Sequence, residues 1–172
     1  KIDLNSVPKL KPSFISTNLV VMLYLKHIKN FNPQEQLDTY FQTQAAQNGK
    51  KVFGLETIDS QFNLLYNSSS LQRQAQSLMC VLHNIDENIV NAEKLTDAYM
   101  KQDLATMLQL SEERKGNECD ALPEEDDAMI YNRNKNWADQ LPSIMKDTPT
   151  FIAVGALHLP GVKGLLNLLK EE

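Results

Sequence analysis

The chain has 172 residues, of which 42% are hydrophobic and 23% are charged, a composition typical of a folded globular protein rather than a disordered one. Its net charge is −5 and its 17 basic residues are scattered, so no nucleic-acid partner is expected. The longest apolar run, Leu19–Leu25, is too short to cross a bilayer, and no transmembrane segment is expected.

The first part of the chain predicts an irregular start followed by a helix. Pro8 and Pro12 favour an irregular lead-in over the first 15 residues. Ser16 or Thr17 is a suitable cap for a helix that ends near His27. The β-branched residues within this segment also suit a strand, and both alternatives stay open.

Residues 33–56 predict a helix and then a strand. The helix is expected over residues 33–47, with Leu37 and Tyr40 among its buried residues, and Asn48 and Gly49 favour its end. The short apolar run that follows, residues 52–56, predicts a buried strand.

The middle of the chain predicts helices. One begins between Thr57 and Ser60, and serines 68–70 offer a cap for the next, whose apolar face runs from Leu71 to Leu82. Residues 88–114 have the pattern of one continuous helix.

The last part of the chain predicts a loop, a helix, a strand and a short helix. Residues 115–123 form the loop, and the acidic residues 124–127 suit a first helical turn, where carboxylates complement the helix dipole, better than a metal site. This helix continues through Trp137 to Leu141. Residues 150–154 predict a second buried strand, and residues 162–169 predict a closing helix.

This order of elements predicts the α/β class: a mostly parallel or mixed sheet with several covering helices. The chain is expected to be rich in helix. Because two strands alone are marginally stable, further strands are expected outside these 172 residues, so that the sheet is incomplete within them.

Two candidate site residues follow the predicted strands. Glu56 ends the predicted strand 52–56, and His158 follows the predicted strand 150–154. Ligands collect at the carboxyl ends of strands in α/β proteins, so a carboxylate and an imidazole there suit a divalent metal or acid–base chemistry. The alternatives are that Glu56 favours a helix start and that His158 is an ordinary loop residue.

Arg133 is the third candidate, because a guanidinium can stabilise developing negative charge. Its alternative role is a cation–π pair with Trp137, one helical turn later. Gly155, Gly161 and Gly164 surround His158 in sequence and indicate a tightly shaped loop.

The two cysteines, Cys80 and Cys119, leave two alternatives open. They form a disulfide, or they are unrelated thiols, of which Cys80 lies on the apolar side of a helix.

Three segments together resemble the TraB/GumN (TIKI-like) family. They are Phe151–Gly161 with the following Gly164-Leu165-Leu166, Lys50–Thr57 with Gln61, and Tyr131–Asn134 with Trp137-Ala138. The segments occur in the family's order, and the resemblance covers about residues 36–171.

The resemblance implies a metal-dependent hydrolase that acts on peptide bonds, with a peptide or protein as its substrate. It implies Glu56 and His158 as ligands of a divalent metal ion and Glu56, Arg133 and His158 as catalytic residues. It also favours an extracytoplasmic location, periplasmic or secreted, because family members are often exported.

The family's site has two Gly-x-x-His motifs, and this chain contains one, Gly155 to His158. We therefore expect residues 1–172 to be a single domain, a fragment that lacks the N-terminal part of a larger family domain. Two other functions stay open: a module that binds or sequesters a peptide or small ligand without turnover, and a structural remnant.

Overall fold

The computed structural model describes residues 9–29 and 31–171. Helices make up 67% of the structure, and no strand occurs in these two ranges. The elements in chain order are α1 Pro12–His27, α2 Leu37–Gln47, α3 Ile58–Asn67, α4 Leu71–His83, α5 Ile85–Met100, α6 Leu104–Glu112, α7 Pro123–Asp126, the π-helix η2 Asp127–Tyr131, α8 Asn132–Met145, the 3₁₀ turn η3 Ala156–His158 and α9 Leu165–Glu171.

The predicted α/β class is wrong, because the described chain is all-α. Residues 52–56 and 150–154, which were predicted as strands, lie outside any helix or strand. Phe53 is 72% exposed and Phe151 is 70% exposed, so neither run is buried as predicted. An apolar run forms a strand only when another strand satisfies its backbone groups, and that partner is a long-range property.

The described chain divides into two compact units, with the boundary between Glu93 and Lys94 inside α5. Each unit is described here by itself. None of the described helices has the length and the hydropathy of a bilayer-spanning segment. No free cysteine thiol occurs in the part of the chain that the structure describes.

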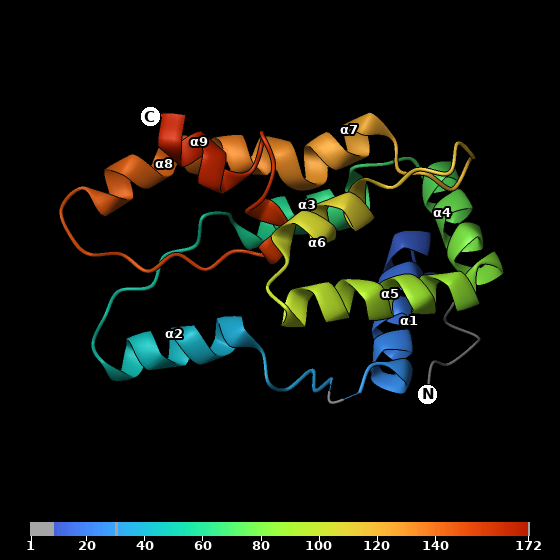
Figure 1. Cartoon of the computed structure of the whole chain (residues 1–172), viewed down its shortest axis with the longest axis horizontal. Helices are drawn as coiled ribbons and strands as arrows, with labels where there is room; N and C mark the ends of the chain where they lie inside the picture. Colours follow the sequence, from blue (N-terminus) through green and yellow to red (C-terminus); the bar gives the residue numbers. More distant parts are fainter. Residues whose placement is uncertain (1–8, 30, 172) are drawn as a thin grey trace. The chain divides into compact units, whose positions relative to one another are not determined.

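In the first unit, α1 packs against α4 (Figure 1). A buried amide joins the two helices, because Ser13 Oγ donates a hydrogen bond of 2.9 Å to Gln74 Oε1. The Gln74 amide nitrogen donates to the backbone oxygens of Tyr66 and Ser69 at 3.2 and 3.0 Å. The Gln74 side chain is therefore satisfied at both ends, as a buried polar group must be.

Several predicted helix limits in this unit need correction. Helix α1 begins at Pro12, which opens the helix instead of interrupting it, because a proline in the first turn loses no helical hydrogen bond. Pro8 lies outside the described residues. Helix α2 begins later than predicted, and its expected buried residues Leu37 and Tyr40 are exposed.

Two predicted helix starts are confirmed. Thr57 caps α3 by accepting a hydrogen bond from the Ser60 N–H, and Ser70 caps α4 by accepting one from the Arg73 N–H. Both side chains satisfy backbone donors that have no partner inside the helix.

In the second unit, α8 packs against α9, and α6 packs against η3 (Figure 1). Its buried apolar side chains come from α5, α6, α8 and α9, and they are Ala98, Met107, Trp137, Ala138, Leu141 and Leu165. The acidic run 124–127 opens the helical segment as predicted, since Glu125 Oε2 accepts a 2.9 Å hydrogen bond from the Leu122 N–H.

The helix predicted over residues 88–114 is two helices, α5 and α6. Gln102 adopts a left-handed conformation with φ of 58° at the break. Asp103 then caps α6 and accepts a 3.0 Å hydrogen bond from the Thr106 N–H. The aspartate was the available signal, because no glycine or proline marks this break.

Candidate functional site

His158 lies at the end of η3, and its side chain is only 6% exposed. The turn that carries it is closed by a 2.9 Å hydrogen bond from the His158 N–H to the Gly155 oxygen. The imidazole lies against the Trp137 ring, with ring centroids 4.5 Å apart and an interplanar angle of 47°. His158 is therefore a buried residue of the second unit and not an exposed loop histidine.

Asn134 contacts one ring nitrogen of His158. Its Oδ1 lies 2.7 Å from His158 Nδ1, and its Nδ2 donates to the backbone oxygens of His158 and Lys163 at 3.1 and 2.8 Å. Asn134 is completely buried, with 0% exposure. One side chain of α8 thus holds both the ring and the backbone of the His158 loop.

Arg133 contacts the other ring nitrogen, because its Nη1 lies 3.2 Å from His158 Nε2. A guanidinium only donates hydrogen bonds, so Nε2 accepts through its lone pair. The same Nη1 donates to the Met129 oxygen at 2.9 Å, and the guanidinium carbon lies 4.8 Å from the Trp137 ring centroid. The alternative role of Arg133, the cation–π pair with Trp137, is thus observed, and its catalytic role stays a prediction.

Glu56 belongs to the first unit, where it precedes α3 and is half-buried. Its Oε2 accepts a 3.3 Å hydrogen bond from Gln61 Nε2. Since the two units are described separately, the expected meeting of Glu56 and His158 in one pocket stays a prediction.

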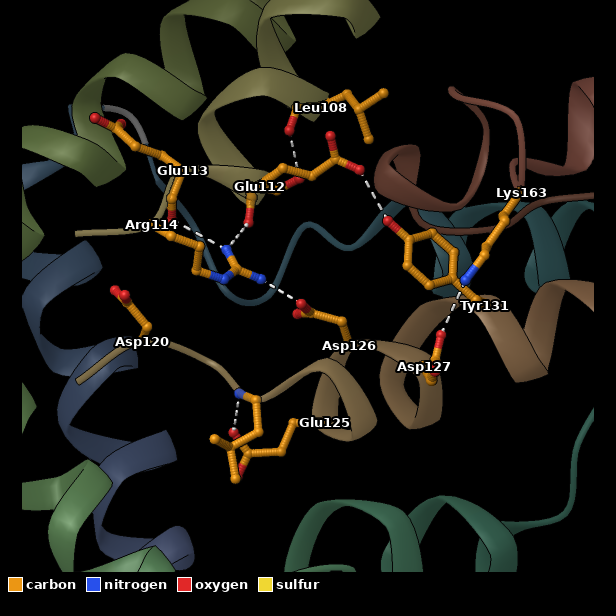
Figure 2. Close-up of polar contacts among 12 residues, drawn as sticks. Leu108, Glu112, Glu113, Arg114, Asp120, Glu125, Asp126, Asp127, Tyr131 and Lys163 are labelled. Carbon is orange, nitrogen blue, oxygen red and sulfur yellow. Dashed lines mark hydrogen bonds and ion pairs between the residues drawn. The ribbon is translucent and has the colours of Figure 1, made fainter. Parts of the chain in front are cut away.

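The loop after His158 is tied to the segment before α8 by a charged network (Figure 2). Lys163 Nζ donates to Asp127 Oδ1 at 3.2 Å and lies 4.5 Å from the centroid of the Tyr131 ring. The Tyr131 hydroxyl donates to Glu112 Oε1 at 2.9 Å. Partial burial and the neighbouring Glu112 carboxylate raise the pKa of Tyr131 to about 12. Lys163 is therefore held through its side chain here and through its backbone oxygen by Asn134.

The three glycines near His158 have different structural requirements. A Cβ on Gly164 would lie 2.1 Å from the Pro160 oxygen, so no side chain fits there. Gly161 has φ of 86°, which L-residues rarely adopt. A Cβ on Gly155 would make an ordinary 3.5 Å contact with His158 Cδ2. The loop shape thus depends on Gly161 and Gly164, while Gly155 can accept a small side chain.

The donor set fits a divalent metal only in part. In metal-binding histidines one ring nitrogen is commonly held by an oxygen acceptor while the other carries the ligating lone pair, and His158 has this arrangement. However, Arg133 contacts that lone pair, and a metal cation cannot share it with a guanidinium. Within residues 9–29 and 31–171, no three His, Cys, Asp or Glu side chains gather as a metal-binding group. His158 therefore suits one ligand position, and only when the Arg133 side chain turns away.

Sequence reasoning missed Asn134 as a site residue, although a signal for it was present. Asn134, Trp137, Ala138 and Leu141 follow the helical spacing of a buried face, and all four are buried. An amide in such a face needs hydrogen-bond partners, and the His158 loop provides them.

Comparison with known proteins gives a family match. The model of the TraB/PrgY/gumN family matches residues 1–172, which is the whole chain. The resemblance inferred from three segments is thus confirmed and extends beyond residues 36–171. No curated protein and no solved structure matches the chain.

Proposed function

Because the chain belongs to the TraB/PrgY/gumN family, we propose that it is part of a metal-dependent hydrolase that cleaves peptide bonds. The observation that carries the proposal is the 3.2 Å contact between Arg133 Nη1 and His158 Nε2. Two of the three predicted catalytic residues meet, although 25 residues separate them in sequence.

In this proposal Glu56 and His158 are ligands of the divalent metal ion. A bound metal would supply Lewis-acid polarisation of a carbonyl and an acidic bound water. The chain's own groups have separate tasks. Arg133 directs a charged donor toward the oxygen that becomes negative in the transition state, and Trp137 supports the guanidinium through its ring face.

The Arg133 contact gives this proposal an unusual consequence. Since Arg133 and a metal ion compete for the same lone pair, removal of the guanidinium is expected to strengthen metal binding and to weaken catalysis. A residue that only stabilised the fold would not produce these opposite effects.

Calorimetric titration with Zn²⁺ and hydrolysis of a fluorogenic peptide library test the proposal on the full-length protein. We expect Glu56→Ala and His158→Ala to lose Zn²⁺ binding and hydrolysis. We expect Arg133→Met to bind Zn²⁺ more tightly and to lower kcat about 100-fold. His83→Ala and Glu93→Ala, which change exposed residues on helices of the first unit, are matched controls and should behave as wild type.

The proposal is wrong if His158→Ala and Glu56→Ala bind Zn²⁺ and cleave peptides like the wild type. The Arg133 contact also favours a second function, binding without turnover, because the guanidinium already satisfies the reactive ring nitrogen. Peptide binding that survives metal chelation, without cleavage products, would support that second function.

A further inference from the structure

We propose that Asn134 is a positioning residue that fixes the neutral His158 imidazole in one tautomer, with its hydrogen on Nδ1 and its lone pair on Nε2. The importance of this tautomer for catalysis rests on the function proposed above. The tautomer itself follows from contacts within the second unit.

Two backbone oxygens determine the orientation of the Asn134 side-chain amide. Two backbone oxygens, those of His158 and Lys163, lie 3.1 and 2.8 Å from its nitrogen. Backbone oxygens only accept hydrogen bonds, so the NH₂ group must face them. The reversed amide would place its oxygen against both acceptors.

The Asn134 oxygen therefore faces the ring. Asn134 Oδ1 lies 2.7 Å from His158 Nδ1, and an amide oxygen cannot donate. The hydrogen of this contact must come from Nδ1. In a neutral imidazole the other nitrogen, Nε2, is then the acceptor.

The opposite side of the ring gives the same result independently. Arg133 Nη1 is a donor at 3.2 Å from Nε2, so it also requires the lone pair there. The other tautomer would place two acceptors together at Asn134 and two donors together at Arg133. Because Asn134 is 0% exposed and His158 is 6% exposed, water cannot relieve these contacts.

The tautomer determines which chemistry the ring can do. Nε2 is the atom that faces Arg133, the other predicted catalytic residue, and only a lone pair on Nε2 can bind a metal or accept a proton there. Asn134 also holds the Lys163 oxygen, so the same amide fixes the ring and the loop that follows it.

Nitrogen NMR of the full chain labelled with ¹⁵N-histidine tests the proposal without metal or substrate. The measurement is made at a pH where imidazoles are neutral, and the His158 signals are those lost in His158→Gln. In the wild type we expect a protonated, pyrrole-type Nδ1 and a pyridine-type Nε2. The double variant Asn134→Ala/Arg133→Met removes both groups that select this tautomer, so it should mix or reverse the pattern.

Two further variants separate the contribution of Asn134 from other effects. Asn136→Ala changes an exposed asparagine of the same helix and should leave the pattern unchanged. Arg133→Met removes the donor at Nε2 and should also keep hydrogen on Nδ1, because Asn134 remains. Arg133 is half-buried, so this variant tests the proposal even if the double variant does not fold.

A wild-type ring with hydrogen on Nε2 would overturn the inference, as would loss of the Nδ1–H pattern in Arg133→Met or its persistence in the double variant Asn134→Ala/Arg133→Met. If the hydrolase proposal also holds, Asn134→Ala should bind Zn²⁺ about 10- to 100-fold more weakly. If the chain binds no Zn²⁺, the NMR result still decides the tautomer, so the two proposals fail separately.

Discussion

Glu56 and His158 both follow an apolar segment, but His158 is the more deeply buried of the two. His158 is buried, and its ring nitrogens contact Asn134 and Arg133, which are 24 and 25 residues earlier in sequence. Glu56 is half-buried and accepts a hydrogen bond from Gln61, five residues later. Long-range contacts with a helix, and not the preceding apolar run, fix the orientation of the imidazole.

The largest expected loss of stability comes from a substitution in the loop that holds His158. Gly164→Ala forces a Cβ into the Pro160 and Leu159 backbone oxygens, so we expect it to destabilise the chain by about 3 kcal/mol or more. Gly155→Ala is the matched control and should change stability by less than about 1 kcal/mol. Urea unfolding followed by the fluorescence of Trp137, the single tryptophan, measures both. Equal effects of the two substitutions would show that the loop is not packed as described.

A second prediction compares the buried His158 with an exposed histidine of the chain, His83. His158→Ala leaves the buried Asn134 oxygen without its donor, so we expect a loss of about 2 to 3 kcal/mol in the free energy of unfolding. His83→Ala changes an exposed side chain and should cost about 0.5 kcal/mol or less. Urea unfolding followed by circular dichroism checks both values. An equal cost for the two substitutions would contradict the buried contacts of His158.

The smallest expected effect concerns the network beside the loop. Tyr131→Phe removes the hydrogen bond to Glu112 and should cost about 1 kcal/mol at pH 8. Since the folded pKa of Tyr131 is raised from 10.0 to about 12, this contribution is complete below pH 10 and is lost as pH rises toward 12. The stability difference between wild type and Tyr131→Phe should therefore shrink between pH 10 and 12. A constant difference across this range in urea unfolding would contradict the role of the hydroxyl.

The sequence predicted local features of the fold better than its architecture. Thr57 and Ser70 act as helix caps because each needs only a backbone N–H three residues later, which is a local requirement. The fold class was wrong because the runs at residues 52–56 and 150–154 have the composition of strands but no strand partner in the described chain. Pairing depends on residues far away in sequence, and periodicity carries no information about them.

Only part of the candidate site could be predicted, because its contacts also join residues that are far apart in sequence. Arg133 and His158 were identified from short motifs, and the structure brings them together. The need for Asn134 could not be inferred from a motif alone, because its partners are the ring of His158 and two backbone oxygens that folding brings near α8. The relation of Glu56 to these residues stays a prediction.

The π-helix η2 has a consequence for how this region tolerates changes in length. Its widened turn, in which the Asn132 N–H bonds the Asp127 oxygen, contains one residue more than an α-helical turn. Each helical residue adds about 100° of rotation, so a relative with one residue fewer in this turn would have α7 rotated by about that angle relative to α8. Such a deletion would separate Asp126 from Arg114, while Arg133 and Asn134 would keep their register toward the imidazole.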